Sequence, residues 1–246
     1  MSFLEVIISG IVQGMTEFLP VSSSGHLVIL HKLFGFKEPQ IDFDIFLHLG
    51  TLSAVFIVFR RDIINIFTTK KKLGLFIIIA TIATAIFVLV FGKGVEASFG
   101  NSKLVGLMLI LTGAWLIIGS FVRFGSSGLT GVKSFLIGIA QGVASIPGIS
   151  RSGATISTAL FLGVEPRSAA RFSFLLSIPA IIGAFLFKIK QGGFSGFSAN
   201  YIFGFFTSCA IGILALKLLL RTIENDRLHF FGFYCIAAGV AALVLL

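Results

Sequence analysis

The stretches GIVQGMTEFLPVSSSG, residues 10–25, and GIAQGVASIPGISRSG, residues 138–153, are two copies of one sequence pattern. At an offset of 128 residues they align without a gap, and Gln13 falls on Gln141. Both copies are rich in glycine, are interrupted by proline, and lie within an otherwise apolar chain. Broken apolar segments at corresponding positions of an internal repeat indicate a binding site inside a membrane protein.

The composition agrees with this interpretation. The chain has 246 residues, of which 56% are hydrophobic and 12% are charged, and its mean hydropathy is +1.05. Soluble domains have about 25% charged residues. Several apolar stretches reach about 18–20 residues, the length that crosses the hydrocarbon core of a bilayer. We therefore expect an all-α polytopic membrane protein that forms a single domain over residues 1–246.

The net charge of +9 is best explained by membrane topology, because the basic residues cluster in short loops. We expect no nucleic-acid partner, and an affinity for anionic lipids or substrates is a second interpretation of the charge. Cys209 and Cys235 both lie in apolar stretches, so we expect them to pack in the interior rather than form a disulfide or a zinc site.

Six segments are expected to cross the membrane, at about 45–62, 73–92, 102–122, 172–190, 199–220 and 228–246. Segments 3–34 and 131–163 differ, because each has two short apolar arms around a kink of Pro, Ser and Gly. Arms of roughly 11–16 residues are too short to cross, so we predict two re-entrant helix–loop–helix pairs. Irregular backbone at membrane depth must be buried in protein or line a wet cavity. The two kinks should therefore meet inside the bundle.

Loop charges predict the orientation. Eleven Lys and Arg residues lie in segments 60–72, 123–133, 163–171 and 221–227, against five in 32–44, 93–103 and 190–198. The first group should be cytoplasmic, which places both termini outside and lets the two re-entrant pairs enter from opposite sides. Three crossings in each half invert the second copy. We thus expect inverted-topology repeats, repeat 1 over about 1–122 and repeat 2 over about 131–246.

The first kink carries the groups of an activated nucleophile. Gln13 and Glu17 are four residues apart and share a helix face, and a carboxylate at membrane depth is by default a functional group. Glu17 or His26 beside Ser23 would activate the hydroxyl. The alternatives are a structural hydrogen-bonded carboxylate, a histidine that only packs in the bundle, and an ordinary helix N-cap formed by Ser22 or Ser24.

The second kink, residues 147–155 (PGISRSGAT), predicts a phosphate cradle. Gly148 allows a ligand to approach the backbone closely, and the planar guanidinium of Arg151 suits phosphate oxygens. Further hydrogen-bond donors are the following helix N-terminus and the hydroxyls of Ser150, Ser152 and Thr155. The alternative, which does not exclude the cradle, is that Arg151 forms an ion pair with Glu17.

Other polar residues are weaker candidates. They are His48 and Thr51 at the border of the pocket, Arg171 and Ser173 around the site, and Asp42 and Asp44 as outer-face residues that help to hold a cation. An acid, a hydroxyl, an imidazole and an arginine under a hydrophobic bundle fit phosphoryl chemistry on an amphiphilic substrate. That chemistry needs positioning and charge stabilisation, which arginine, helix ends and a divalent cation supply.

At these residues the chain resembles the undecaprenyl-pyrophosphate phosphatase family of bacterial membranes, the bacitracin-resistance type. Gln13 to Glu17 is similar to the family's (E/Q)-x-x-x-E motif, Ser22 to His26 to its Ser-rich stretch ending in His, and residues 147–155 to its PGxSRSxxT motif. The likeness covers almost the whole chain. Position 13 is Gln where many members have Glu, so Glu17 is left as the expected metal ligand.

The resemblance implies hydrolysis of undecaprenyl pyrophosphate to the monophosphate and inorganic phosphate, which recycles the lipid carrier for peptidoglycan and confers bacitracin resistance. It also implies a divalent cation, Mg²⁺ or Ca²⁺, and a multi-pass protein of the cell membrane whose active site is open to the outer face. If the family's catalytic residues are transferred to the matching positions of this chain, they are Glu17, Ser23, His26 and Arg151. The nucleophile is left open between Ser23, His26 and water, and a homodimer is left open as the assembly.

Two rival functions remain. A polyprenyl-phosphate flippase or transporter would use the same inverted-repeat scaffold, but it needs no nucleophile. A membrane phosphatase of the acid-phosphatase type shares only the Ser24-Gly25-His26 stretch and lacks that family's other signatures. Release of inorganic phosphate separates the enzyme from the flippase.

Overall fold

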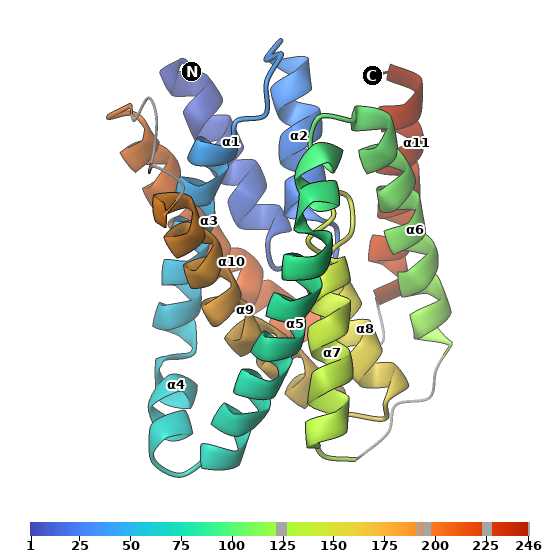
Figure 1. The fold of residues 1–246 in the computed structure, drawn as a ribbon. Helices are drawn as coiled ribbons and strands as arrows, with labels where there is room; N and C mark the ends of the chain where they lie inside the picture. Colours follow the sequence, from blue (N-terminus) through green and yellow to red (C-terminus); the bar gives the residue numbers. More distant parts are fainter. Residues whose placement is uncertain (122–126, 191–192, 194–197, 223–227, 246) are drawn as a thin grey trace.

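The computed structural model describes residues 1–121, 127–190, 193, 198–222 and 228–245. In this part of the chain the elements are α1 (Phe3–Thr16), α2 (Ser23–Leu33), α3 (Ile41–Val58), α4 (Arg60–Phe67), α5 (Lys71–Ser98), α6 (Ser102–Ser120), α7 (Gly131–Val143), α8 (Arg151–Phe161), α9 (Pro166–Lys190), α10 (Tyr201–Thr222) and α11 (Leu228–Leu245) (Figure 1). Six of them, α3, α5, α6, α9, α10 and α11, are long and apolar enough to cross a membrane. The expected all-α polytopic membrane protein is confirmed.

Several boundaries differ from the sequence-based expectation. Helix α5 continues to Ser98 rather than ending near residue 92, so Lys93, which was expected in a loop, lies on a helix. The first crossing helix ends at Val58 rather than near residue 62, because the backbone of Phe59 leaves helical geometry (φ −98°, ψ 16°), and the expected loop contains the short helix α4. Helix α9 begins at Pro166, a residue suited to the first helical turn, so Arg167 and Arg171 lie on a helix rather than in a loop. Arg123 and Arg227, counted among the loop charges, lie outside the described residues.

The re-entrant pairs are α1 with α2 and α7 with α8. These helices have 14, 11, 13 and 11 residues. At 1.5 Å per residue they are roughly 16–21 Å long, which is short of the ~30 Å hydrocarbon core. Both termini lie at one end of the bundle; α1 descends from that end and α2 returns to it, whereas α7 and α8 enter from the opposite end (Figure 1). The two pairs therefore enter from opposite sides, as expected.

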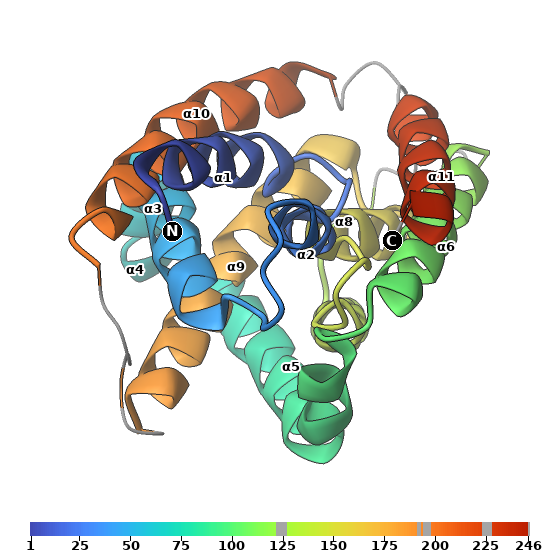
Figure 2. The same cartoon turned by 90° about the horizontal axis from the view of Figure 1, so that it is seen from above.

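The two kinks meet at the centre of the bundle, where α2 and α8 are surrounded by the longer helices (Figure 2). The hydroxyl of Ser152 donates a hydrogen bond to the backbone oxygen of Leu19 at 3.0 Å, which joins the second kink to the first. A side chain on Gly25 would place its Cβ 3.0 Å from the Cα of Gly148, so the backbones touch only because both residues are glycine. Gly148 also has a φ of +96°, which favours glycine.

Each re-entrant pair is supported by a helix from the other half of the chain. Helix α1 packs along α10, and α7 packs along α5. The largest apolar cluster lies beside the kinks and includes the fully buried Ile156, Leu160, Phe172 and Leu175. Each re-entrant pair thus packs on a helix of the other half of the chain, and both kinks are held beside the same apolar core. The repeat boundaries remain a prediction of the sequence.

Candidate active site

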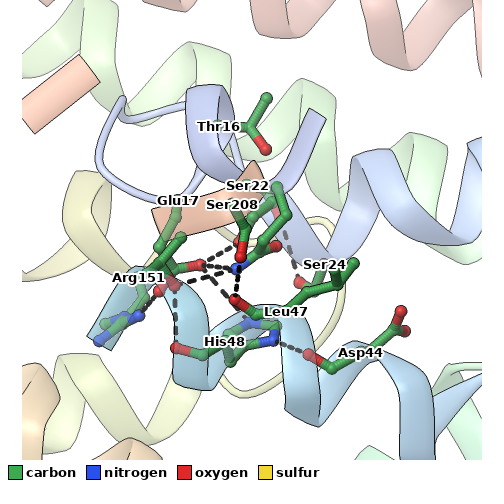
Figure 3. Close-up of polar contacts among 12 residues, drawn as sticks. Thr16, Glu17, Ser22, Ser24, Asp44, Leu47, His48, Arg151 and Ser208 are labelled. Atoms are coloured by element: carbon green, nitrogen blue, oxygen red, sulfur yellow. Dashed lines mark hydrogen bonds and ion pairs between the residues drawn. The ribbon is translucent and has the colours of Figure 1, made fainter. Parts of the chain in front are cut away.

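Glu17 is the centre of a hydrogen-bond network where the kinks meet (Figure 3). Its side chain is only 2% exposed. The Oε2 atom accepts hydrogen bonds from Gln13 Nε2 at 2.9 Å and from Ser23 Oγ at 2.6 Å, and His48 Nε2 lies 3.4 Å from it. The Oε1 atom is paired with the guanidinium of Arg151. A carboxylate this deeply buried requires such partners, because its desolvation is costly.

Glu17 lies at the end of one helix and contacts the first residues of two others. Glu17 is the C-cap of α1, where the helix dipole disfavours a negative charge. However, its partners Ser23 and Arg151 are the first residues of α2 and α8. Side chains from the first residues of these two helices therefore reach the carboxylate, and helix N-termini attract anions such as phosphate.

The two helix starts have matching hydroxyl arrangements. Ser22 caps α2 by accepting from the Gly25 amide at 3.3 Å, and Ser150 caps α8 by accepting from the Gly153 amide at 3.1 Å. The Oγ atoms of Ser22 and Ser24 are 3.4 Å apart, and those of Ser150 and Ser152 are 3.3 Å apart. The N-cap interpretation of Ser22 is therefore confirmed, and the duplicated sequence produces duplicated local geometry.

The two helix starts differ in the backbone conformation of their N-cap residues, Ser22 and Ser150. The φ of Ser22 is +66°, the only positive φ of a non-glycine residue within the described ranges, whereas the corresponding Ser150 has a φ of −73°. Such a conformation costs of order 1–3 kcal/mol and is held by the surrounding structure. The strained residue directly precedes Ser23, so the backbone strain is located next to the hydroxyl that contacts Glu17.

The side chain of His26 forms no hydrogen bond with Ser23 or Glu17. Its Nδ1 atom lies 2.7 Å from the backbone oxygen of Ser22, and its Nε2 atom lies 2.8 Å from the hydroxyl of Tyr234 on α11. The imidazole and phenol rings are stacked, with centroids 5.6 Å apart and an interplanar angle of 5°. Because a carbonyl oxygen can only accept, the proton of neutral His26 is on Nδ1 and the Tyr234 hydroxyl donates to Nε2.

Hydrogen bonds from neighbouring helices hold the second kink in place, and the first of them come from α6. Buried Thr112 donates from Oγ1 to the backbone oxygen of Gly148 at 2.9 Å and accepts from the amide of Ser150 at 3.2 Å. On the other side, Thr155 and Ser173 share a hydrogen bond of 2.6 Å. The hydroxyls of Ser152 and Thr155 thus bind protein groups in this structure. Their role toward phosphate stays a prediction.

The structure thus brings together most of the residues predicted from the sequence. Gln13, Glu17, Ser23 and Arg151 form one network, with the remaining kink hydroxyls beside it. His48 and Thr51, two of the weaker candidates, also join it, since Thr51 accepts from Gln13 Nε2 at 3.4 Å. Thr112 and Tyr234 were missed, because nothing in their local sequence marks them.

Three of the weaker candidates have other partners. Arg171 lies 3.7 Å from Asp62 rather than in the Glu17 network, so only Ser173 of that pair supports the site. Asp42 is paired with Lys188 at 2.7 Å, and Asp44 lies 3.8 Å from His31. The expected role of Asp42 and Asp44 in holding a cation stays a prediction.

The residues fit a divalent cation only if the substrate completes its coordination. Within the described residues, no group of three or more His, Cys, Asp or Glu side chains is arranged to hold a metal ion. However, Gln13 Oε1 is buried without a hydrogen-bond partner, next to the carboxylate of Glu17. Mg²⁺ is commonly held by one or two carboxylates together with substrate phosphates and water. Gln13 and Glu17 would supply such a partial set of oxygen ligands.

Comparison with known proteins identifies the family. The model of the bacitracin resistance protein BacA family matches residues 6–241. The chain belongs to this family. It is 41% identical to an undecaprenyl-diphosphatase of Desulfosudis oleivorans, with 98% of this chain and 97% of that protein covered. It is 42% identical to one of Carboxydothermus hydrogenoformans (100% and 98% covered) and 39% identical to one of Korarchaeum cryptofilum (100% of both). In this member of the BacA family, the matched region contains the entire Glu17 network.

Proposed function

We propose that the protein is an integral membrane phosphatase that hydrolyses undecaprenyl pyrophosphate to undecaprenyl phosphate and inorganic phosphate. The observation that carries the proposal is the convergence of Ser23 and Arg151 on Glu17 at the N-termini of two buried helices. Three relatives of nearly equal length carry the name of this activity. The reaction would recycle the lipid carrier for peptidoglycan synthesis and confer bacitracin resistance.

Ser23 is the proposed nucleophile. Its Oγ atom attacks the terminal phosphorus while Glu17 Oε2, 2.6 Å away, accepts the hydroxyl proton. The bond between that phosphorus and the bridging oxygen breaks, and undecaprenyl phosphate departs with the electron pair and takes up the proton. Water then attacks the phosphoserine, Glu17 transfers a proton from this water to the departing Ser23 Oγ, and inorganic phosphate leaves.

Arg151 is proposed to hold the transferred phosphate. One guanidinium nitrogen is paired with Glu17, whereas Nη1 is buried without a hydrogen-bond partner. A buried charged donor without a partner is costly, and a phosphate oxygen would satisfy it. The ion pair and the phosphate grip are therefore compatible, because they use different nitrogen atoms.

His26 is less suited than Glu17 to act as the base. Both of its ring nitrogens are engaged, by the Ser22 backbone and by Tyr234. The competing hypotheses, a His26 nucleophile or an activated water, are separated by the experiments below. When bound, Mg²⁺ or Ca²⁺ would neutralise charge that develops on the phosphate oxygens. Glu17 and Gln13 Oε1 are the proposed ligands.

The outer face of the cell membrane is proposed to be the end of the bundle that carries both termini. Helix α4 and the starts of α5 and α7 lie at the opposite end (Figure 1). These segments carry Arg60, Arg61, Lys70, Lys71, Lys72 and Lys133, and such an excess of basic residues favours the cytoplasm. The first kink would then be reached from outside. Homodimerisation also remains a proposal, which light scattering of the purified protein measures.

Release of inorganic phosphate from a C55 pyrophosphate by the detergent-purified protein tests the proposal. We expect the wild type to release phosphate, Glu17→Ala and Arg151→Ala to lose at least 99% of the rate, and chelation of divalent cations to reduce it reversibly. Ser53→Ala is the matched control, since Ser53 only bonds within its own helix. Transfer of lipid across vesicles without phosphate release would assign the protein to the flippases instead.

A further inference from the structure

The orientation of the His48 imidazole leaves one ring nitrogen facing the carboxylate of Glu17 (Figure 3). The other ring nitrogen, Nδ1, lies 2.7 Å from the backbone oxygen of Asp44, one turn earlier on α3. Because a carbonyl oxygen can only accept a hydrogen bond, the proton of the neutral ring is on Nδ1. The Nε2 atom therefore presents a lone pair, and it lies 3.4 Å from Oε2 of Glu17.

This contact brings together two atoms that both accept, because an ionised carboxylate has no proton to donate. Arg151 does not relieve it, since the guanidinium pairs with the other oxygen of Glu17, Oε1. Two positive groups would suit the contact, namely a proton on Nε2 or a metal ion bound by both atoms. The distance of 3.4 Å favours the metal ion, because a hydrogen bond from nitrogen to oxygen usually spans about 2.7–3.2 Å.

The separation of the two atoms also fits two ligands of one small cation. Nitrogen and oxygen ligands that are each about 2.1 Å from Zn²⁺ at a tetrahedral angle lie about 3.4 Å apart. Histidines that bind metals usually donate their other ring N–H to a carboxylate or a backbone carbonyl, as His48 does to Asp44. His48 thus has both the distance and the supporting hydrogen bond of a metal ligand.

Gln13 supplies a third donor atom. Its side chain is fully buried, and its Oε1 atom has no hydrogen-bond partner. Its Nε2 atom donates to Oε2 of Glu17 at 2.9 Å, which keeps the amide beside the carboxylate. Catalytic zinc sites have three protein ligands and keep one position open for water or substrate. A phosphate of the substrate would occupy that open position.

The second copy of the repeat provides an internal comparison. At the offset of 128 residues, the three ligand positions correspond to Gln141, Ser145 and Leu176. The Oε1 atom of Gln141 is also buried without a partner, so the amide by itself does not define a cation site. The second copy offers neither a carboxylate nor an imidazole at these positions. The complete set of ligands therefore belongs to the first kink.

We propose that His48, Glu17 and Gln13 bind a divalent transition metal such as Zn²⁺, through Nε2, the carboxylate and Oε1. An imidazole ligand suits Zn²⁺ better than Mg²⁺ or Ca²⁺, which take oxygen ligands. Because Arg151 balances the charge of Glu17, the ion would leave two positive charges in excess, which the pyrophosphate of the substrate would offset. The assignment rests on the proposed function at this point, and it changes the class of cation expected at the site.

Zinc binding to the full-length, untagged protein in detergent tests the assignment without measuring turnover. Zn²⁺ and Mg²⁺ are titrated separately by calorimetry, and the thermal midpoint shows that each variant is folded. His48→Gln removes the nitrogen ligand. His229→Gln is the matched control, because that histidine lies on α11 and packs on Phe230. Loss of even an outer hydrogen bond of a ligand weakens metal binding about 10–100-fold. We therefore expect the Kd for Zn²⁺ to rise at least tenfold in His48→Gln and to stay within twofold in the control.

Zinc K-edge X-ray absorption of the wild type, loaded with one equivalent of Zn²⁺, identifies the ligands without any variant. We expect the multiple-scattering signal of one imidazole. A shell of oxygen atoms alone, or equal zinc affinity of the wild type and His48→Gln, would overturn the assignment and leave a proton as the group between His48 and Glu17. Binding of Mg²⁺ as tight as that of Zn²⁺ would overturn the class of metal.

Phosphate release from a C55 pyrophosphate, measured on the same samples, separates this assignment from the proposed function. Release supported by Mg²⁺ in a protein that does not bind zinc would refute the zinc site and retain the phosphatase. Zinc binding through His48 without any phosphate release would retain the metal site and refute the phosphatase.

Discussion

The Oγ atom of Ser23 donates a hydrogen bond of 2.6 Å to Oε2 of Glu17, across the turn that joins the two arms of the first re-entrant pair. The same carboxylate holds Arg151 of the second pair with its other oxygen. One buried group thus links a hydroxyl and a guanidinium that lie more than a hundred residues apart in the sequence. The proposed nucleophile, base and phosphate-binding group are already in contact without substrate.

This arrangement predicts that Ser23→Ala abolishes turnover, with a loss of at least a thousandfold, because no other hydroxyl contacts Glu17 in the described network. Mass spectrometry of the acid-quenched wild type should detect a phosphate on Ser23. Ser53→Ala, a control on α3, should keep the wild-type rate. Near-normal turnover of Ser23→Ala together with inactive His26→Ala would instead favour His26 as nucleophile.

Tyr234→Phe tests the contact of α11 with the site. The variant keeps the stacked ring but removes the hydroxyl that donates to His26 Nε2. One hydrogen bond contributes about 0.5–1.5 kcal/mol, so we expect kcat to fall about two- to tenfold with little change in KM. Tyr201→Phe is the matched control, because that tyrosine packs on Phe43 away from His26. Identical kinetics of the two variants would exclude a role of Tyr234 in positioning His26.

Thr112→Val should destabilise the second kink. The change leaves the Gly148 oxygen and the Ser150 amide without their buried partner, and each unsatisfied group costs about 1–3 kcal/mol. We expect the thermal midpoint of the purified protein to fall by several degrees. Thr81→Val is the control, because its hydroxyl bonds only to Ile77 of the same helix. Equal midpoints for the two variants would contradict the bridging role of Thr112.

Gly25→Ala should separate the kinks. The added Cβ would lie 3.0 Å from Gly148 Cα, a backbone atom that cannot move aside alone. We expect phosphate release to fall more than tenfold while the protein still inserts and is purified as a folded species. At Gly183, where nothing lies within 4 Å of an added Cβ, alanine should keep the activity and slightly favour the helix. Full activity of Gly25→Ala would show that close contact of the kinks is not needed.

The features that depend on local pattern follow from the amino-acid sequence alone. Apolar length predicted six crossing helices, and the short arms around residues 10–25 and 138–153 predicted the re-entrant pairs. Both follow from the thickness of the bilayer and the rise of a helix. The charge pattern predicted a loop at residues 60–72, but this segment contains helix α4. Charged residues at a membrane surface fit a short helix as well as a loop.

Which side chains meet depends on the packing of the helices. The sequence left open whether Arg151 pairs with Glu17, and the packing of the two kinks settles it. Tyr234 lies 208 positions from His26, and no periodicity relates them. Such contacts depend on how complete helices pack against one another, which the local spacing of residues does not encode. The repeated sequence therefore predicts the two re-entrant pairs, and the packing of the helices brings a few of their polar atoms into contact.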